Sequence, residues 1–125
     1  ISCLPHGKTQ NILSSLPSDI KICDLSADFR FNDIELYEKV YEKHHEATDL
    51  QQEAVYGLTE INRDKIRKSR FIANPGCYPT SALLPLLPLI KGNFVKKGTI
   101  VVDSKSGVSG AGRTLKNNLG CVMPV

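Results

Sequence analysis

Residues 71–80 read FIANPGCYPT, and this stretch organises the expected fold. The apolar run FIA predicts a buried strand, NPG predicts a tight turn, and CYPT predicts a helix start, where proline is tolerated. Cys77 stands at that junction. The free amides of a helix start favour thiolate over thiol, and a thiolate there can attack a carbonyl carbon. The alternative is a buried structural cysteine beside a Pro-Gly turn, since free cysteine is among the most buried residue types.

A second unusual segment, residues 103–113, reads DSKSGVSGAGR and follows the apolar run TIVV at residues 99–102. The apolar run predicts a buried strand. The glycines and serines after it predict an open backbone rich in donors, and glycine lets a ligand approach the main chain. Arg113 can bind a carboxylate or phosphate in a bidentate way. The alternative is a flexible surface loop with a solvated arginine. The glycine spacing matches neither a Walker loop nor the dinucleotide motif G-x-G-x-x-G.

Composition excludes several function classes. The 125 residues suffice for one domain with a hydrophobic core, and the net charge is only +3. Basic residues gather at positions 62–70, but acidic residues lie among them, so a solvated helix face is expected and no nucleic-acid site. No apolar run reaches eighteen residues, so no membrane partner is expected.

The cysteines indicate a reducing compartment. Cys3, Cys23, Cys77 and Cys121 are widely spaced, without a C-x-x-C or paired-histidine motif. This spacing argues against a zinc site and favours reduced thiols in a cytoplasmic protein. Cys3 and Cys23 lie in apolar, strand-like runs, where packing is the expected role. No metal site is expected.

The remaining pattern predicts alternating helices and strands. Short links between them imply parallel strands with right-handed crossovers. The loops at residues 4–7 and 25–28 then follow two successive strands, at the sheet edge where open α/β sheets bind ligands. Expected helices cover residues 8–16, 33–43, 62–68 and the segment from Cys77 to Gly92, and expected strands cover residues 20–25, 70–73 and 98–104. Residues 54–58 form a short apolar stretch.

Two details of this pattern carry their own expectations. Pro85 and Pro88 each remove a backbone donor, so they are expected to kink or shorten the helix that follows Cys77. His44 and His45 have no further metal ligands near them in the sequence, so both are expected to be exposed.

Five motifs together resemble N-acetyl-γ-glutamyl-phosphate reductase, in that family's order and spacing over residues 3–119. They are NPGCYPT at 74–80, the segment 103–113, LPHG at 4–7, DLSADFR at 24–30 and AVYGLTEIN at 54–62. The resemblance implies an α/β fold, in which the end of a parallel Rossmann-like nucleotide-binding sheet leads into an α+β catalytic domain of the semialdehyde dehydrogenase type.

The resemblance also implies how the chain is divided. Residues 1–73 would form the C-terminal part of the NAD(P)-binding domain, and residues 74–119 the start of a catalytic and dimerisation domain. Residues 120–125 form an atypical tail that does not resemble the family. The chain is therefore interpreted as an internal fragment of a longer protein, which would be a homo-oligomer.

The implied activity is the NADPH-dependent reductive dephosphorylation of N-acetyl-L-glutamyl 5-phosphate to N-acetyl-L-glutamate 5-semialdehyde, in arginine biosynthesis. Thiolate Cys77 would attack the acyl phosphate and expel phosphate, and hydride would reduce the resulting thioester to a thiohemiacetal that releases the aldehyde. Two alternatives stay open: the related carrier-protein-linked aminoadipyl-phosphate reductase of lysine biosynthesis, and a non-catalytic remnant.

The resemblance assigns roles by position. Cys77 would be the nucleophile, and Asn74, Gly76 and the Tyr78 amide would position the substrate or hold the oxyanion. Arg30 and Arg113 would contact an anion; the alternative for Arg30 is a salt bridge to Asp28 or Asp33. The candidates for cofactor binding are His6, Ser106, Gly107, Ser109, Gly110 and Ala111.

The family's acid–base histidine is expected downstream of the glycine-rich segment. All three histidines of this chain, His6, His44 and His45, precede Cys77, and none is assigned that role. The chain is therefore expected to be inactive alone, since it also contains no phosphate-binding turn for NADPH.

Overall fold

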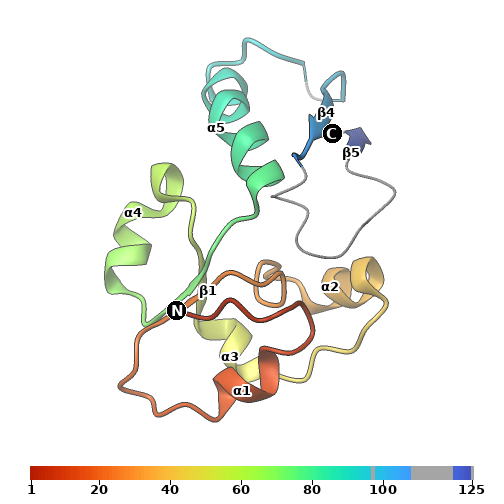
Figure 1. Cartoon of the computed structure of the whole chain (residues 1–125). Coiled ribbons are helices and arrows are strands. Elements are labelled where there is room, and N and C mark those ends of the chain that lie inside the picture. Colours follow the sequence, from red (N-terminus) through yellow and green to blue (C-terminus); the bar gives the residue numbers. More distant parts are fainter. Residues whose placement is uncertain (97, 108–119, 125) are drawn as a thin grey trace. The chain divides into compact units, whose positions relative to one another are not determined.

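A computed structural model describes residues 1–96, 98–107 and 120–124. The chain divides into two compact units, Ile1–Gly76 and Cys77–Val125. The first unit carries a parallel sheet with four helices, and the second carries one long helix and a β-hairpin (Figure 1).

The sheet of the first unit contains β1 (Ile22–Asp24), β2 (Ala54–Tyr56) and β3 (Phe71–Ala73) in the order β1-β3-β2. Both pairings are parallel, and Ser2 adds a further parallel bridge to Asp24. In register, Asp24 lies opposite Ala73, which lies opposite Tyr56. The three strands therefore end together, and the predicted α/β fold with a parallel sheet is confirmed.

Helices connect the strands in the expected alternation. α1 (Gln10–Ser14) precedes β1, α2 (Ile34–Tyr41) and α3 (Thr48–Glu53) separate β1 from β2, and α4 (Thr59–Lys68) separates β2 from β3. The Asp33 side chain caps α2 by accepting a hydrogen bond from the Leu36 amide at 3.2 Å. The left-handed residue Glu42 ends the helix.

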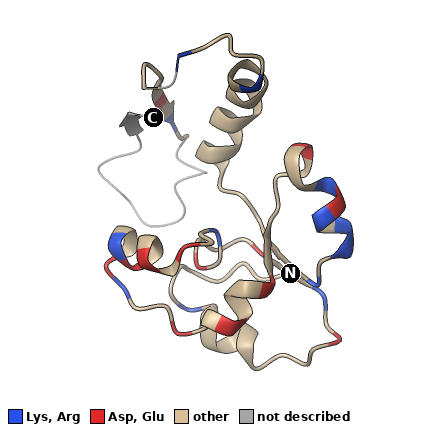
Figure 2. Cartoon of the chain, turned by 180° about the vertical axis from the view of Figure 1, so that it is seen from behind, with Lys and Arg blue, Asp and Glu red and all other residues tan. Residues whose placement is uncertain are grey.

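α4 begins three residues before the predicted start at position 62. Asn62 interrupts its helical dihedral angles, with φ −120° and ψ 19°, and its side-chain amide donates to the Tyr56 carbonyl at 2.9 Å. The basic residues that identified this helix all follow Asn62. Figure 2 shows these Lys and Arg residues along α4, with acidic residues on the same helix.

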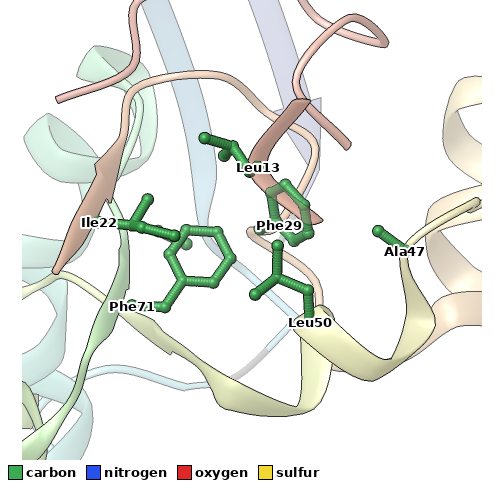
Figure 3. Packing of buried hydrophobic residues seen from close by; sticks show 7 residues of the cluster. Leu13, Ile22, Phe29, Ala47, Leu50 and Phe71 are labelled. Atoms are coloured by element: carbon green, nitrogen blue, oxygen red, sulfur yellow. The ribbon is translucent and has the colours of Figure 1, made fainter. Parts of the chain in front are cut away.

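The core of the first unit forms where alternate strand residues meet α1 and α3 (Figure 3). Ile22 and Phe71 are paired in register, point to the same face of the sheet and are buried. The next residue in each strand, Cys23 or Ile72, points to the opposite face and is only half-buried. This period of two is that of a pleated strand with one well-covered face. The core residues are Leu13, Ile22, Phe29, Ala47, Leu50, Phe71 and Ala73.

The second unit contains α5 (Cys77–Lys91) and an antiparallel pair formed by β4 (Val101–Lys105) and β5 (Gly120–Pro124). A strand forms here as predicted, but the expectation that it is buried is wrong, because Val101 is 71 % exposed. Among the described residues, β4 pairs with β5 alone. β4 also includes residues 103–105, which the sequence had placed in the glycine-rich segment.

α5 continues through Pro85 and Pro88, so neither proline shortens it, and the expected kink stays a prediction. Gly92 follows the last residue of the helix, as predicted. Pro85 and Pro88 are both exposed, so the carbonyls that lose their helical partner lie on the solvent side of the helix. The helix closes in a Schellman motif: the Phe94 amide donates to Leu89 at 2.9 Å, and Asn93 has a φ of 57°.

Candidate functional site

Cys77 is the first residue of α5 and directly follows the turn after β3. Its thiol is free and the residue is exposed, so it is not the buried structural cysteine of the alternative interpretation. Cys3 is exposed as well, and Cys23 is half-buried. The expectation that Cys3 packs in a strand is wrong, because only Ser2 of that run pairs with the sheet.

The turn before Cys77 is an extension of the parallel sheet. The Asn74 amide donates to the Asp24 carbonyl at 2.8 Å, and its side chain donates to the Pro75 carbonyl at 3.0 Å. On the other side, Gly57 donates to Ala73 at 2.9 Å. A Cβ at Gly57 would lie 2.8 Å from the Ile72 side chain and 3.2 Å from Pro75, so glycine is required for this close approach.

Arg30 holds the same turn from the loop after β1. Its Nε donates to the Asn74 carbonyl at 2.8 Å, and its Nη2 donates to the Leu25 carbonyl at 2.7 Å. Within the described residues no carboxylate forms a salt bridge with Arg30, so the predicted alternative of a pair with Asp28 or Asp33 is wrong. The guanidinium of Arg30 instead donates to the two backbone carbonyls of Asn74 and Leu25, which lie at the ends of β3 and β1.

The charge of Arg30 also reaches two tyrosines. Burial raises the pKa of Tyr41 and of Tyr56, and the Arg30 charge opposes that rise in both.

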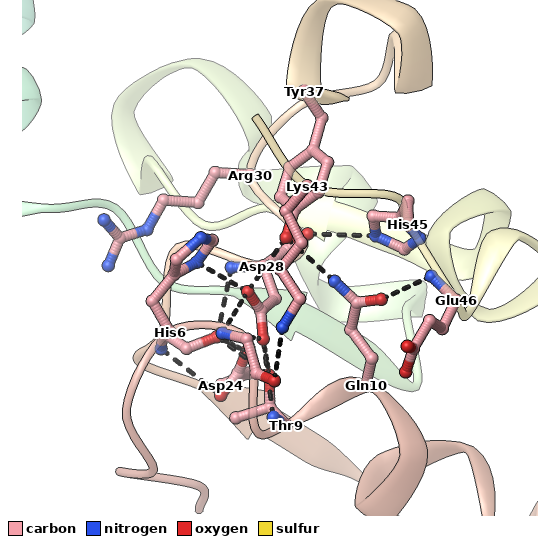
Figure 4. A network of polar contacts seen from close by, with 12 residues as sticks. His6, Thr9, Gln10, Asp24, Asp28, Arg30, Tyr37, Lys43, His45 and Glu46 are labelled. Atoms are coloured by element: carbon pink, nitrogen blue, oxygen red, sulfur yellow. Dashed lines mark hydrogen bonds and ion pairs between the residues drawn. The ribbon is translucent and has the colours of Figure 1, made fainter. Parts of the chain in front are cut away.

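Asp28 is the centre of a buried polar network (Figure 4). Its carboxylate accepts hydrogen bonds from the Gly7 amide at 2.8 and 2.9 Å, from the Thr9 hydroxyl and from Tyr37 at 3.2 Å, and it pairs with His6 Nδ1 at 2.6 Å. Burial by itself would raise the pKa of Asp28. The hydrogen bonds from Thr9 and Gly7 and the His6 charge outweigh burial and lower it.

Further polar side chains surround this carboxylate. Burial, followed by the Asp28 charge, raises the pKa of Tyr37 far above its ordinary value. The hydroxyl of Tyr37 accepts from Gln10 Nε2 at 2.9 Å, and Gln10 Oε1 accepts from the Glu46 amide at 2.6 Å. Every one of these groups is satisfied by a partner, as buried polar groups require.

The two adjacent histidines differ. His44 is exposed as predicted and pairs with Glu38 at 2.6 Å. His45 is buried, contrary to the prediction: its Nε2 lies 3.0 Å from the Asp28 carbonyl oxygen, and its ring packs edge-on against Phe29 at 5.5 Å. The loop after α2 turns the second histidine inward, which no periodicity in the sequence signals.

The structure places His6 at the surface end of the Asp28 network. Its side chain is 34 % exposed and its ring packs against Tyr41, with centroids 4.2 Å apart. Asp28 was considered from the sequence only as a partner of Arg30, and Thr9 and Tyr37 were not singled out. One sequence feature could have indicated the network. Asp28 lies two residues after Ser26, in the loop that follows one predicted strand, and His6 lies in the loop that follows the neighbouring strand.

Ser106 and Gly107 directly follow β4, where the Ser106 hydroxyl donates to the Gly107 carbonyl at 3.1 Å. A Cβ at Gly107 would meet no atom within 4 Å. Gly76 and Tyr78 flank Cys77 in the chain. The other predicted site residues, Ser109, Gly110, Ala111 and Arg113, lie outside the described residues.

The chain, with its parallel sheet followed by a helix that begins at an exposed cysteine, is matched by two family models of one protein class. Residues 1–69 match the family model described as "Semialdehyde dehydrogenase, NAD binding domain", and residues 77–122 match "Semialdehyde dehydrogenase, dimerisation domain". The chain belongs to the semialdehyde dehydrogenase family.

Named relatives narrow the resemblance further. The chain is 60 % identical over 114 residues to a rice (Oryza sativa) protein described as "Probable N-acetyl-gamma-glutamyl-phosphate reductase, chloroplastic", covering 91 % of this chain and 28 % of that protein. It is 53 % identical over 119 residues to the Afipia carboxidovorans protein named "N-acetyl-gamma-glutamyl-phosphate reductase", covering 93 % and 34 %. The resemblance inferred from the motifs is confirmed. The chain spans about a third of the length of these curated relatives.

Among the described residues, no helix is long and apolar enough to cross a membrane, and no three metal-ligating side chains gather into a candidate metal site.

Proposed function

We propose that this chain supplies the nucleophile and part of the cofactor-binding domain of an N-acetyl-γ-glutamyl-phosphate reductase of arginine biosynthesis. The reaction is the reductive dephosphorylation of N-acetyl-L-glutamyl 5-phosphate to N-acetyl-L-glutamate 5-semialdehyde. The observation that carries the proposal is the exposed thiol of Cys77 at the start of α5, in a chain 60 % identical to a reductase-named relative.

The chemistry assigned to Cys77 follows from its place on the helix. Cys77 begins α5, and the N-terminal end of a helix carries partial positive charge, which favours a thiolate and an adjacent oxyanion. The thiolate attacks the acyl carbon, a C–S bond forms, the C–O bond to phosphate breaks, and phosphate leaves with the electron pair. A nicotinamide cofactor, when bound, would supply the hydride for reduction of the thioester. Collapse of the resulting thiohemiacetal returns the thiolate and releases the aldehyde once its hydroxyl proton is removed.

The turn residues are proposed to hold the reacting carbonyl in place. Asn74, Gly76 and the Tyr78 amide surround Cys77 in the chain and are the proposed positioning or oxyanion groups. Arg30 is proposed to contact an anion with Nη1, because Nε and Nη2 already serve the backbone. Arg113 is also proposed to contact an anion, and this proposal rests on the sequence resemblance.

The residues of this chain fit one part of a binding site for a nicotinamide cofactor. The match to an NAD-binding domain supports such a cofactor, and His6 offers a partly exposed ring at the end of the parallel sheet. The neighbouring Gly7 amide is already bound to Asp28, so this loop offers it to no phosphate. Ser106, Gly107, Ser109, Gly110 and Ala111 remain proposed cofactor contacts, and the preference for NADPH rests on the family resemblance alone.

Two further proposals concern the whole protein. The match to a dimerisation domain supports a homo-oligomer. A cytoplasmic location is proposed from the unpaired cysteines, although the rice and Arabidopsis thaliana relatives are named chloroplastic.

A chimera tests the function. The matching 114-residue segment of the rice relative is replaced by that of this chain, and phosphate-dependent reduction of NADP⁺ by N-acetyl-L-glutamate 5-semialdehyde is measured. Cys77→Ser is expected to lower kcat by roughly a thousandfold or more, because the nucleophile is lost. Cys3→Ser, which removes another exposed thiol, should leave kcat within about twofold.

The same assay separates the alternatives. A folded chimera without activity would support the non-catalytic remnant. Activity that appears only with carrier-linked aminoadipyl phosphate would support the lysine-pathway enzyme. Activity that survives Cys77→Ser would overturn the role of Cys77.

A further inference from the structure

We infer that Asp28 is a positioning residue that holds His6 as its Nδ1–H tautomer, so that His6 presents Nε2 as a hydrogen-bond acceptor for a hydroxyl or amide group of the ligand. Only the identity of that ligand, the ribose hydroxyls or carboxamide of a nicotinamide cofactor, rests on the proposed function. The tautomer of His6 does not.

The first step is the direction of the bond between His6 and Asp28. The carboxylate of Asp28 accepts from the Gly7 amide, which can only donate, and from Thr9, whose hydroxyl lies against it. An ionised carboxylate has no proton to give. His6 Nδ1, at 2.6 Å from Asp28 Oδ1, must therefore be the donor.

The direction of the other bonds agrees. The Glu46 amide donates to Gln10 Oε1, which turns the Gln10 NH₂ group toward the Tyr37 oxygen. The Tyr37 hydroxyl can therefore donate its own proton to Asp28 Oδ1, and the two oxygens are 3.2 Å apart. The buried chain of donors thus ends on the Asp28 carboxylate, and His6 is the partner of that carboxylate with the most exposed side chain.

The second step concerns the other ring nitrogen. A neutral imidazole with a proton on Nδ1 has a lone pair on Nε2. No hydrogen bond from any described residue reaches Nε2 of His6, and the side chain is 34 % exposed. Packing against Tyr41 fixes the ring plane. An acceptor at this position matches a hydroxyl or amide donor and not a phosphate oxygen.

The other two histidines provide internal controls. His45 Nε2 faces the Asp28 carbonyl, which can only accept, and its Nδ1 faces the Ala47 amide at 3.3 Å, which can only donate. His45 should therefore be the Nε2–H tautomer. His44 is 80 % exposed, and exposed pairs are weak, so its two tautomers should average.

Two-bond ¹H–¹⁵N correlation spectra of the ¹⁵N-labelled 125-residue chain test this, at about pH 8 where imidazole is ordinarily neutral. His6→Gln and His44→Gln assign the signals. The expected result is a protonated Nδ1 for His6, a protonated Nε2 for His45 and averaged signals for His44. A protonated Nε2 on His6, or the averaged pattern of His44, would overturn the inference.

A second measurement tests the role of Asp28. His6→Gln should shift the side-chain ¹³C resonance of Asp28, whereas His44→Gln should leave it in place. Asp28→Ala should give His6 the averaged pattern. If Asp28→Ala does not fold, the ¹³C comparison decides by itself, and an unmoved Asp28 resonance in His6→Gln contradicts the pairing.

The ligand is tested separately in the rice chimera. His6→Ala should raise the KM for NADP⁺ roughly two- to tenfold, the range of one neutral hydrogen bond, with a smaller change in kcat. His44→Ala is the matched control. An unchanged KM with the expected tautomer would overturn the cofactor contact alone, and an inactive chimera with the expected tautomer would count against the proposed function and leave the tautomer standing.

Discussion

Arg30 Nε donates to the backbone carbonyl of Asn74 at 2.8 Å, across 44 positions of sequence. This bond joins the loop after β1 to the turn that leads into Cys77, and a second bond from the same guanidinium holds Leu25. A single half-buried side chain thus couples two strand ends, where the sequence predicted an anion contact and left an ion pair with Asp28 or Asp33 as the alternative.

The first prediction follows from this coupling. Arg30→Lys keeps the charge but loses the planar pair of donors, so the free energy of unfolding should fall by about 1–2 kcal/mol in urea titrations. Arg67→Lys on the exposed face of α4 should change it by less than about 0.5 kcal/mol. Equal values for the two variants would show that the Asn74 bond contributes little.

A second prediction concerns thiol reactivity. Cys3 and Cys77 are both exposed, but only Cys77 begins a helix. In the native chain, Cys77 should react with iodoacetamide several-fold faster than Cys3, measured by peptide mass spectrometry over time. Half-buried Cys23 should be slower than both. Equal rates for Cys77 and Cys3 would argue against an activated thiol, and unfolding in urea should remove any difference between them.

The third prediction concerns acid stability. The pKa of Asp28 is lower in the folded chain than the value of about 3.9 in an unfolded one, so its ionised form stabilises the fold. That contribution is complete above the unfolded value and disappears as the pH falls through the folded one. Urea midpoints of the wild type should therefore drop more steeply than those of Asp28→Asn as the pH falls below about 4. Urea midpoints that fall equally steeply with pH in the wild type and in Asp28→Asn would contradict this prediction.

The fourth prediction uses two phenylalanines of opposite exposure. Phe71 is 0 % exposed in the core, and Phe94 is 80 % exposed. Phe71→Ala should lower the free energy of unfolding by about 3–5 kcal/mol, enough to unfold a marginal domain. Phe94→Ala should change it by less than about 0.5 kcal/mol. Phe71→Leu, with an intermediate loss, keeps the comparison measurable if Phe71→Ala does not fold.

Most elements could be predicted because their signals are local. The apolar runs at β1 and β3, the turn at Pro75 and Gly76, and the helix from Cys77 are set by residues within a few positions of one another. Local sequence signals did not predict burial correctly at β4, where Val101 is exposed, or at Cys3, which is also exposed. Burial depends on which residues from distant parts of the chain pack against a segment.

Part of the candidate site was also predictable. The sequence identified Cys77, Asn74, Arg30 and His6 by their motifs, and the structure places Arg30 against Asn74. It did not identify the buried network that holds His6. That network joins Thr9, Asp28 and Tyr37, whose side chains bind groups 9 to 27 residues away in the sequence.

The alternation of strands and helices, the parallel arrangement and the family follow from the amino-acid sequence alone, because periodicity, turn residues and motif order are properties of the chain in one dimension. Three features required the folded chain: Arg30 holds a carbonyl, His45 is buried while His44 is exposed, and Asp28 orients His6. These outcomes depend on which distant polar groups become neighbours once strand pairing removes water, and each buried donor or acceptor must then find a partner.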